Sequence, residues 1–155
     1  MIDIRLALDL LAAAVAERGH HFVYPPIGDL ERDCVYRPHS GSLTLAGEAL
    51  SLAGVSPGDL ELLHGNSVRD LYARGQLPVS LTLGAVVVLD AAEHSQDRGQ
   101  AWGDAVEHAR RVAVRFITLL PDHALDGALE PTPAHAGRSF RVRHRPAAAP
   151  NNSTR

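Results

Sequence analysis

Lysine is absent from this 155-residue sequence, cysteine occurs once, and aromatic residues make up only 5% of the chain. The single Cys34 excludes an internal disulfide and agrees with a reducing compartment. With so few aromatic side chains, the core has to be built from Leu, Val and Ala, a composition that suits helices. All 15 basic residues are Arg, which we attribute to a GC-rich genome rather than to function.

The signatures of several enzyme classes are also missing. The sequence has no Walker loop, no Gly-x-Gly-x-x-Gly fingerprint, no His-Glu-x-x-His zinc motif and no Gly-x-Ser-x-Gly nucleophile elbow. We therefore expect no cofactor. The apolar stretch at residues 81–89 is far too short to span a bilayer, and Asp3 and Asp9 make the N-terminal apolar run unlike a signal peptide. We predict a cytoplasmic protein that does not bind membranes.

Charge is distributed unevenly along the chain. Residues 1–120 carry 15 acidic residues against 10 Arg, whereas residues 121–155 carry 3 acidic residues against 5 Arg. Prolines accumulate after residue 120 among Ala, Gly, Asn and Ser, and such a composition cannot bury enough apolar surface to offset the entropy of ordering. We predict one globular domain at residues 1–120 and a flexible tail at 121–155. Candidate interaction residues in this tail are Phe140, Arg138, Arg141, Arg143 and Arg145.

Helical periodicity recurs through the predicted domain and indicates four to five short helices. Asp3 and Gly19 are suited to capping the first helix, and Ser56 before Pro57 is a further start signal. The run Val86-Val87-Val88 is compatible with a buried strand, but the apolar spacing continues past it and favours a helix. The predicted helical segments, of which 67–73 is only a turn or two, are residues 4–18, 43–53, 59–64, 67–73, 80–95 and 102–116.

Two short segments predict a β-hairpin. Residues 20–24 are rich in aromatic and β-branched side chains and end at Pro25, and residues 33–37 end at Pro38. A two-stranded hairpin is marginally stable alone, so we expect the first helix to pack beneath it. The predicted fold class is α+β, mainly α, with four to five short helices, a small two-stranded β-hairpin and a disordered C-terminal tail.

Several segments between residues 4 and 115 carry a resemblance. They are the opening amphipathic helix, the Cys34-Val35-Tyr36 strand, residues 45–55 (LAGEALSLAGV) and residues 96–105 (QDRGQAWGDA). Together they resemble a family of small uncharacterised proteins of high-GC Gram-positive bacteria (actinobacteria) and their phages. The resemblance supports the architecture and brings no assigned activity. Similar proteins often carry a second Cys before the Leu-x-Gly-x-Ala-Leu helix, where this chain reads Ser-Gly-Ser-Leu-Thr, so it implies no two-cysteine chemistry.

Residues 45–63 have the order of a helix-turn-helix, with an apolar helix, a Gly turn and a second helix whose Leu60 and Leu63 point inward. A recognition helix presents Arg, Lys, Asn, Gln or Ser to DNA. The residues expected to face outward here are Pro57, Gly58, Asp59, Glu61 and His64. Carboxylates repel phosphates, so two core helices joined by a turn are the favoured interpretation. A DNA-binding regulator with a basic tail remains the alternative.

Histidines near the single cysteine are weak candidates for a metal site. His20, His21, Cys34 and His39, with His64 further along, offer the nitrogen and sulfur ligands that zinc prefers. Their spacing matches no zinc finger, so surface or partly buried histidines are the favoured interpretation. For Cys34, a small buried apolar residue is favoured over a nucleophile with His39 as its base.

Charged residues also gather around the turn before the last helix. Glu93, His94, Asp97, Asp104 and His108 are predicted to form a solvated face. The only Trp, Trp102, opens the last apolar stripe, where it serves either as a packing anchor or as an exposed interface residue.

Lacking a catalytic constellation, the sequence favours a non-enzymatic accessory or regulatory protein that acts through protein–protein contacts, in a phage or mobile-element setting. A helix-turn-helix regulator is the second hypothesis and a metal-dependent enzyme the third. Nucleic acid is a disfavoured partner because the body of the protein is acidic.

Overall fold

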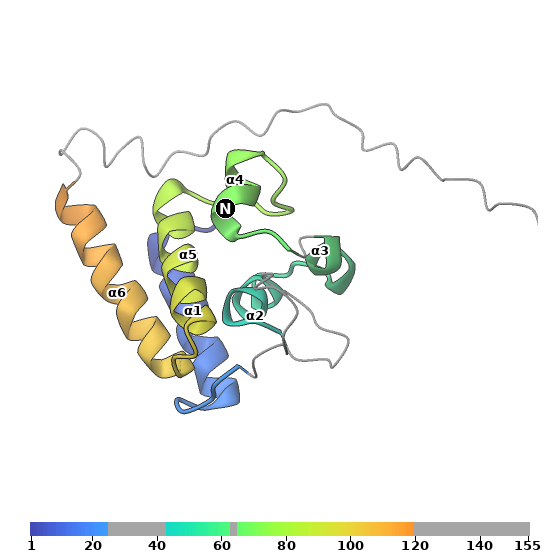
Figure 1. Ribbon diagram of the computed structural model, residues 1–155. Helices are drawn as coiled ribbons and strands as arrows, with labels where there is room; N and C mark the ends of the chain where they lie inside the picture. Colours follow the sequence, from blue (N-terminus) through green and yellow to red (C-terminus); the bar gives the residue numbers. More distant parts are fainter. Residues whose placement is uncertain (25–42, 63–64, 120–155) are drawn as a thin grey trace, which may run out of the picture.

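The computed structural model describes residues 1–24, 43–62 and 65–119. These residues form six helices (Figure 1). Their bounds are α1 Ile4–Arg18, α2 Leu45–Leu52, α3 Pro57–Leu62, α4 Val68–Ala73, α5 Leu83–Asp97 and α6 Trp102–Leu119.

Helices α1 and α5 form the centre of the arrangement. Helix α6 packs most extensively on α5 and also contacts α1, whereas α2 packs on α1 and α5, and α4 packs on α5. Figure 1 shows α6 on one side of the α1–α5 pair and the three short helices α2, α3 and α4 on the other. The two central helices therefore each have neighbours on both sides.

Helices α1 and α5 begin at the same end of the molecule because the residues before them pair. Ile2 donates its amide to the carbonyl of Ser80 at 2.9 Å and accepts from the amide of Thr82 at 3.0 Å, as an isolated parallel bridge between Ile2 and Leu81. Asp3 then caps α1 by accepting from the amide of Leu6 at 2.8 Å, and Thr82 caps α5. One short bridge thus sets both helix starts.

Small side chains let the helices approach closely. Gly84 in the first turn of α5 lies so near Ile4 and Phe116 that an added Cβ would be 3.3 and 3.4 Å from their atoms. Alanines supply the same close approach elsewhere, and larger side chains such as Leu11, Leu89 and Trp102 fill the remaining interior. Each fully buried Leu contributes on the order of 1.5–3 kcal/mol relative to an exposed one.

The predicted β-hairpin is wrong. Residues 20–24 form no strand, and residues 33–37 lie outside the described residues. The carbonyls of His20 and Phe22 instead accept hydrogen bonds from the first amides of α6, Gly103 at 3.0 Å and Trp102 at 2.8 Å. An aromatic, β-branched segment resembles a strand in sequence, but here its polar backbone groups cap a helix. The described part of the fold is therefore helical.

Most predicted helical segments are confirmed, but the described residues form six helices and not the predicted four to five, because residues 68–73, predicted as only a turn or two, are a separate helix. Helix α1 matches the predicted range of 4–18, with Asp3 as its N-cap and Gly19 as its C-cap at φ +100°. The valines at 86–88 lie in helix α5, not in a strand. The predicted boundary at residue 120 and the tail at 121–155 lie outside the described residues. Among the helices that the structure describes, none is long and apolar enough to cross a membrane.

Candidate functional site

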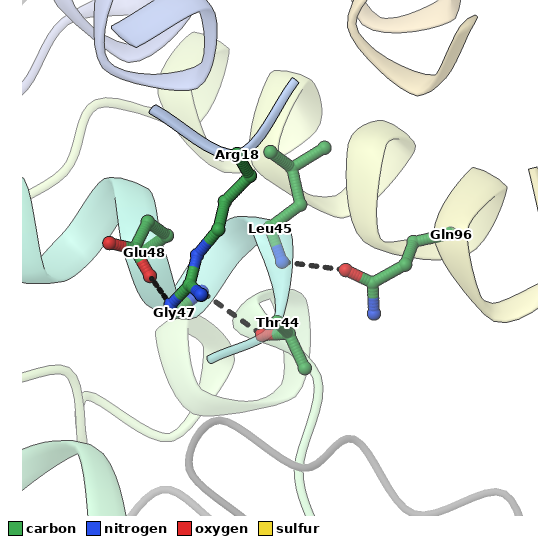
Figure 2. A network of polar contacts seen from close by, with 6 residues as sticks. All are labelled: Arg18, Thr44, Leu45, Gly47, Glu48 and Gln96. Atoms are coloured by element: carbon green, nitrogen blue, oxygen red, sulfur yellow. Dashed lines mark hydrogen bonds and ion pairs between the residues drawn. The ribbon is translucent and has the colours of Figure 1, made fainter. Parts of the chain in front are cut away.

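Buried polar side chains concentrate on one face of α5, where they hold the starts of two other helices. Gln96 is buried, and its Oε1 accepts a 2.6 Å hydrogen bond from the amide of Leu45, the first residue of α2 (Figure 2). Thr44 Oγ1 accepts from the amide of Gly47 at 3.0 Å. Two of the amides that a helix start leaves without intrahelical partners are thereby satisfied.

Helix α2 is also tied to the end of α1. Arg18 Nη2 lies 3.5 Å from Glu48 Oε2, and Figure 2 shows this ion pair beside the capped start of α2. The Arg18 side chain is 37% exposed and the 3.5 Å contact is long, so we expect the pair to contribute only about 1 kcal/mol.

Glu93 has the same role at α4 that Gln96 has at α2. Its side chain is 2% exposed, and Oε2 accepts from the amide of Val68, the first residue of α4, at 3.2 Å. Ser67 Oγ accepts from the amide of Asp70 at 3.1 Å. A carboxylate at a helix start also interacts favourably with the helix dipole. Both helices are thus capped by their own hydroxyl residue and by α5.

This finding corrects the prediction that Glu93 belongs to a solvated face. Among the other members of that set, His94, Asp97 and Asp104 are exposed and His108 is half-buried. Glu93 and Gln96 follow Leu89 by four and seven residues, which places them on the buried side of α5. That spacing was the available signal, but it does not reveal which amides they meet.

Two carboxyl groups on α5 have shifted acidity. Burial raises the pKa of Asp90. The positive charges of Arg69 and His94 oppose this shift, whereas the negative charge of Asp70 adds to it. Burial likewise raises the pKa of Asp97, and His94 opposes it. Both raised pKa values mean that partial burial on α5 makes ionisation of these carboxyl groups less favourable.

Trp102 is fully buried at the start of α6. Its ring meets Phe22 edge-on, with centroids 4.8 Å apart and planes at 76°. The neighbouring Gly103 lies against the His20 ring, where an added Cβ would clash with Nδ1. Trp102 therefore anchors residues 20–24 on α6 and presents no surface to a partner.

The predicted metal ligands are only partly visible. His20 and His21 are both exposed, and Cys34, His39 and His64 lie outside the described residues. Within residues 1–24, 43–62 and 65–119, no three His, Cys, Asp or Glu side chains come together in a way that could hold a metal ion. The candidate tail residues, namely Phe140, Arg138, Arg141, Arg143 and Arg145, also fall in the part that is not described.

The segment considered as a helix-turn-helix presents little to DNA. Most of α2 is buried, and helix α3 exposes Pro57, Gly58 and Glu61. Ser56 donates its hydroxyl to Asp59 Oδ2 at 2.6 Å and accepts from the Asp59 amide at 3.2 Å. Ser56 thus caps α3, as predicted. The face that would meet DNA combines an acidic side chain with apolar or small residues, which disfavours phosphate contacts.

Exposed apolar side chains gather at one end of the helix bundle. Among the described residues, eight large apolar side chains are exposed, and six lie where α1 and α5 begin and α6 ends. We call this set the apolar end. Val114 is 65% exposed and Leu119 is 82% exposed. The six residues are Met1, Leu6, Leu83, Val114, Ile117 and Leu119.

The three segments share this end because of contacts already described. The bridge between Ile2 and Leu81 joins the starts of α1 and α5, and Gly84 lies beside both Ile4 and Phe116. The part of α6 around Phe116 therefore lies next to the first turn of α5. Figure 1 shows the end of α6 and the start of α5 at the same end of the molecule. The sequence did not indicate this gathering, because its members come from three separate segments, and Leu6 and Leu83 are 77 residues apart.

Comparisons with known proteins return no relatives: no protein-family model, no curated protein and no solved structure matches the chain. The resemblance to small actinobacterial and phage proteins thus stays a prediction.

Proposed function

We propose that this protein is a non-enzymatic accessory or regulatory protein that binds a partner protein through the apolar end. The observation that carries the proposal is the gathering of six exposed apolar side chains at one end of the bundle. Single exposed apolar residues are ordinary, but several together are typical of interaction surfaces. We keep the cytoplasm as the proposed location, because the single cysteine agrees with a reducing compartment.

The buried polar groups of the described residues support this proposal. Glu93 and Gln96 are engaged with the starts of α4 and α2, so these polar side chains serve the fold. Trp102, the alternative anchor for a partner, is enclosed. The apolar end is therefore the surface best suited to binding.

Site-specific photo-cross-linking in the cells that express the protein tests the proposal. A photoreactive phenylalanine analogue at Leu83 or at Ile117 should yield the same discrete adduct, because both residues lie at the apolar end. The matched control is Leu52, which is also exposed but lies on α2, outside this end. Identical adduct patterns at all three positions, or no adduct at Leu83 and Ile117, would refute the proposal.

A further inference from the structure

Charge divides the described surface into two unlike parts. The three segments that contain the apolar end are residues 1–7, 80–87 and 110–119. Together these segments carry four Arg and a single carboxylate. The remaining described residues carry four Arg and eleven carboxylates. Within the described part of the chain, this end is thus a basic island on an otherwise acidic set of residues.

The charges within this island are available to a partner. Arg5, Arg111 and Arg115 are exposed on α1 and α6. Arg110 is already engaged, since its Nη1 lies 2.7 Å from Glu107 Oε1. The one carboxylate of the island, Asp3, accepts from the Leu6 amide as the cap of α1. Three guanidinium groups therefore flank the exposed apolar side chains.

We propose that the apolar end binds an acidic amphipathic helix of a partner protein. This inference rests on the proposed function and names the chemistry of its partner. Apolar side chains on one face of such a helix would cover Val114 and Ile117 on the outer side of α6, and carboxylates along its edges would meet Arg111 and Arg115. Arg recognises carboxylates through paired hydrogen bonds, which adds orientation to the apolar contact.

Other occupants fit the charge pattern less well. A symmetric pairing of two copies would bring the arginines of one apolar end against those of the other, and like charges repel. Anionic membranes are typically bound by clusters of four to eight basic residues. Among the described residues, the three free Arg at this end of the molecule fall short of that number. An acidic, partly apolar protein segment satisfies both the charge and the exposed side chains.

Fluorescence anisotropy with the full-length protein tests the inference. The probe is a labelled synthetic helix of Leu, Ala and Glu with the Leu residues on one face, and its matched control has Lys in place of every Glu. We expect the acidic peptide to bind at least about tenfold more tightly than the basic one, and added salt to narrow the difference. The double variant Arg111→Glu/Arg115→Glu should weaken binding of the acidic peptide about tenfold. Arg98→Glu, an exposed Arg at the other end of α5, should not.

Each other outcome overturns the inference. Equal binding of both peptides would mean apolar adhesion without charge selection, and no binding would mean that this end does not accept a helix. Preferential binding to phosphatidylserine vesicles would replace the helix with a membrane, and a dimer in sedimentation would replace it with a second copy. A discrete cross-link from Leu83 and Ile117 would leave the proposed function standing in the first two cases, so the two failures can be told apart.

Discussion

Gln96 provides the sharpest test of how α5 organises the short helices. Replacing it with Met keeps the length and volume of the side chain and removes the acceptor that holds the Leu45 amide at 2.6 Å. Leu45 is fully buried, so its amide would lose its partner at a site where water cannot readily substitute. The change therefore isolates one hydrogen bond.

The expected loss of stability follows from the missing hydrogen bond to the Leu45 amide. A buried donor without a partner costs about 1–3 kcal/mol, more than the roughly 1 kcal/mol that an ordinary hydrogen bond contributes. A domain of this size has a free energy of unfolding of only about 5–15 kcal/mol. We expect Gln96→Met to lower the midpoint of thermal unfolding by several degrees.

Urea unfolding followed by circular dichroism measures this loss, and hydrogen exchange locates it. The Leu45 amide should exchange faster in Gln96→Met, whereas amides in α6 should change little. Gln100→Met is the matched control because Gln100 is exposed. If Gln96→Met and Gln100→Met unfold within about 0.3 kcal/mol of each other, the assignment of Gln96 as an anchor of α2 is wrong.

Three further substitutions test other parts of the structure by chemical unfolding. Gly103→Ala should cost about 1–2 kcal/mol because its Cβ meets the His20 ring, and adding His20→Ala should recover most of that loss; failure to recover would refute the clash. Burial raises the pKa of Asp90, so the free energy of unfolding should fall as the pH rises through that pKa. Asp90→Asn should therefore be at least as stable as the native protein at pH 7, and any gain in stability over the native protein should vanish in acid, where Asp90 is protonated. Leu11→Ala should cost about 2–5 kcal/mol because Leu11 is fully buried, and a cost below 1 kcal/mol would contradict its place in the core.

Much of the helical architecture could be predicted because its signals are local. Apolar spacing in α1 and α6, and capping residues such as Asp3 and Ser56, lie within a few residues of the structure they specify. The hairpin prediction failed at residues 20–24 because strand propensity depends on the types of the side chains. It does not say which groups the backbone amides and carbonyls will bond to. The carbonyls of His20 and Phe22 found that partner about 80 residues away, at the start of α6.

The sequence by itself determined which segments are helical and where several of them start, since periodicity and capping act over one or two turns. Tertiary structure alone decided that Glu93 and Gln96 turn inward to cap α4 and α2. It also decided that exposed apolar and Arg residues from α1, α5 and α6 share one end. Both outcomes depend on which helix ends lie next to each other. Packing between segments that are distant in the sequence decides this arrangement.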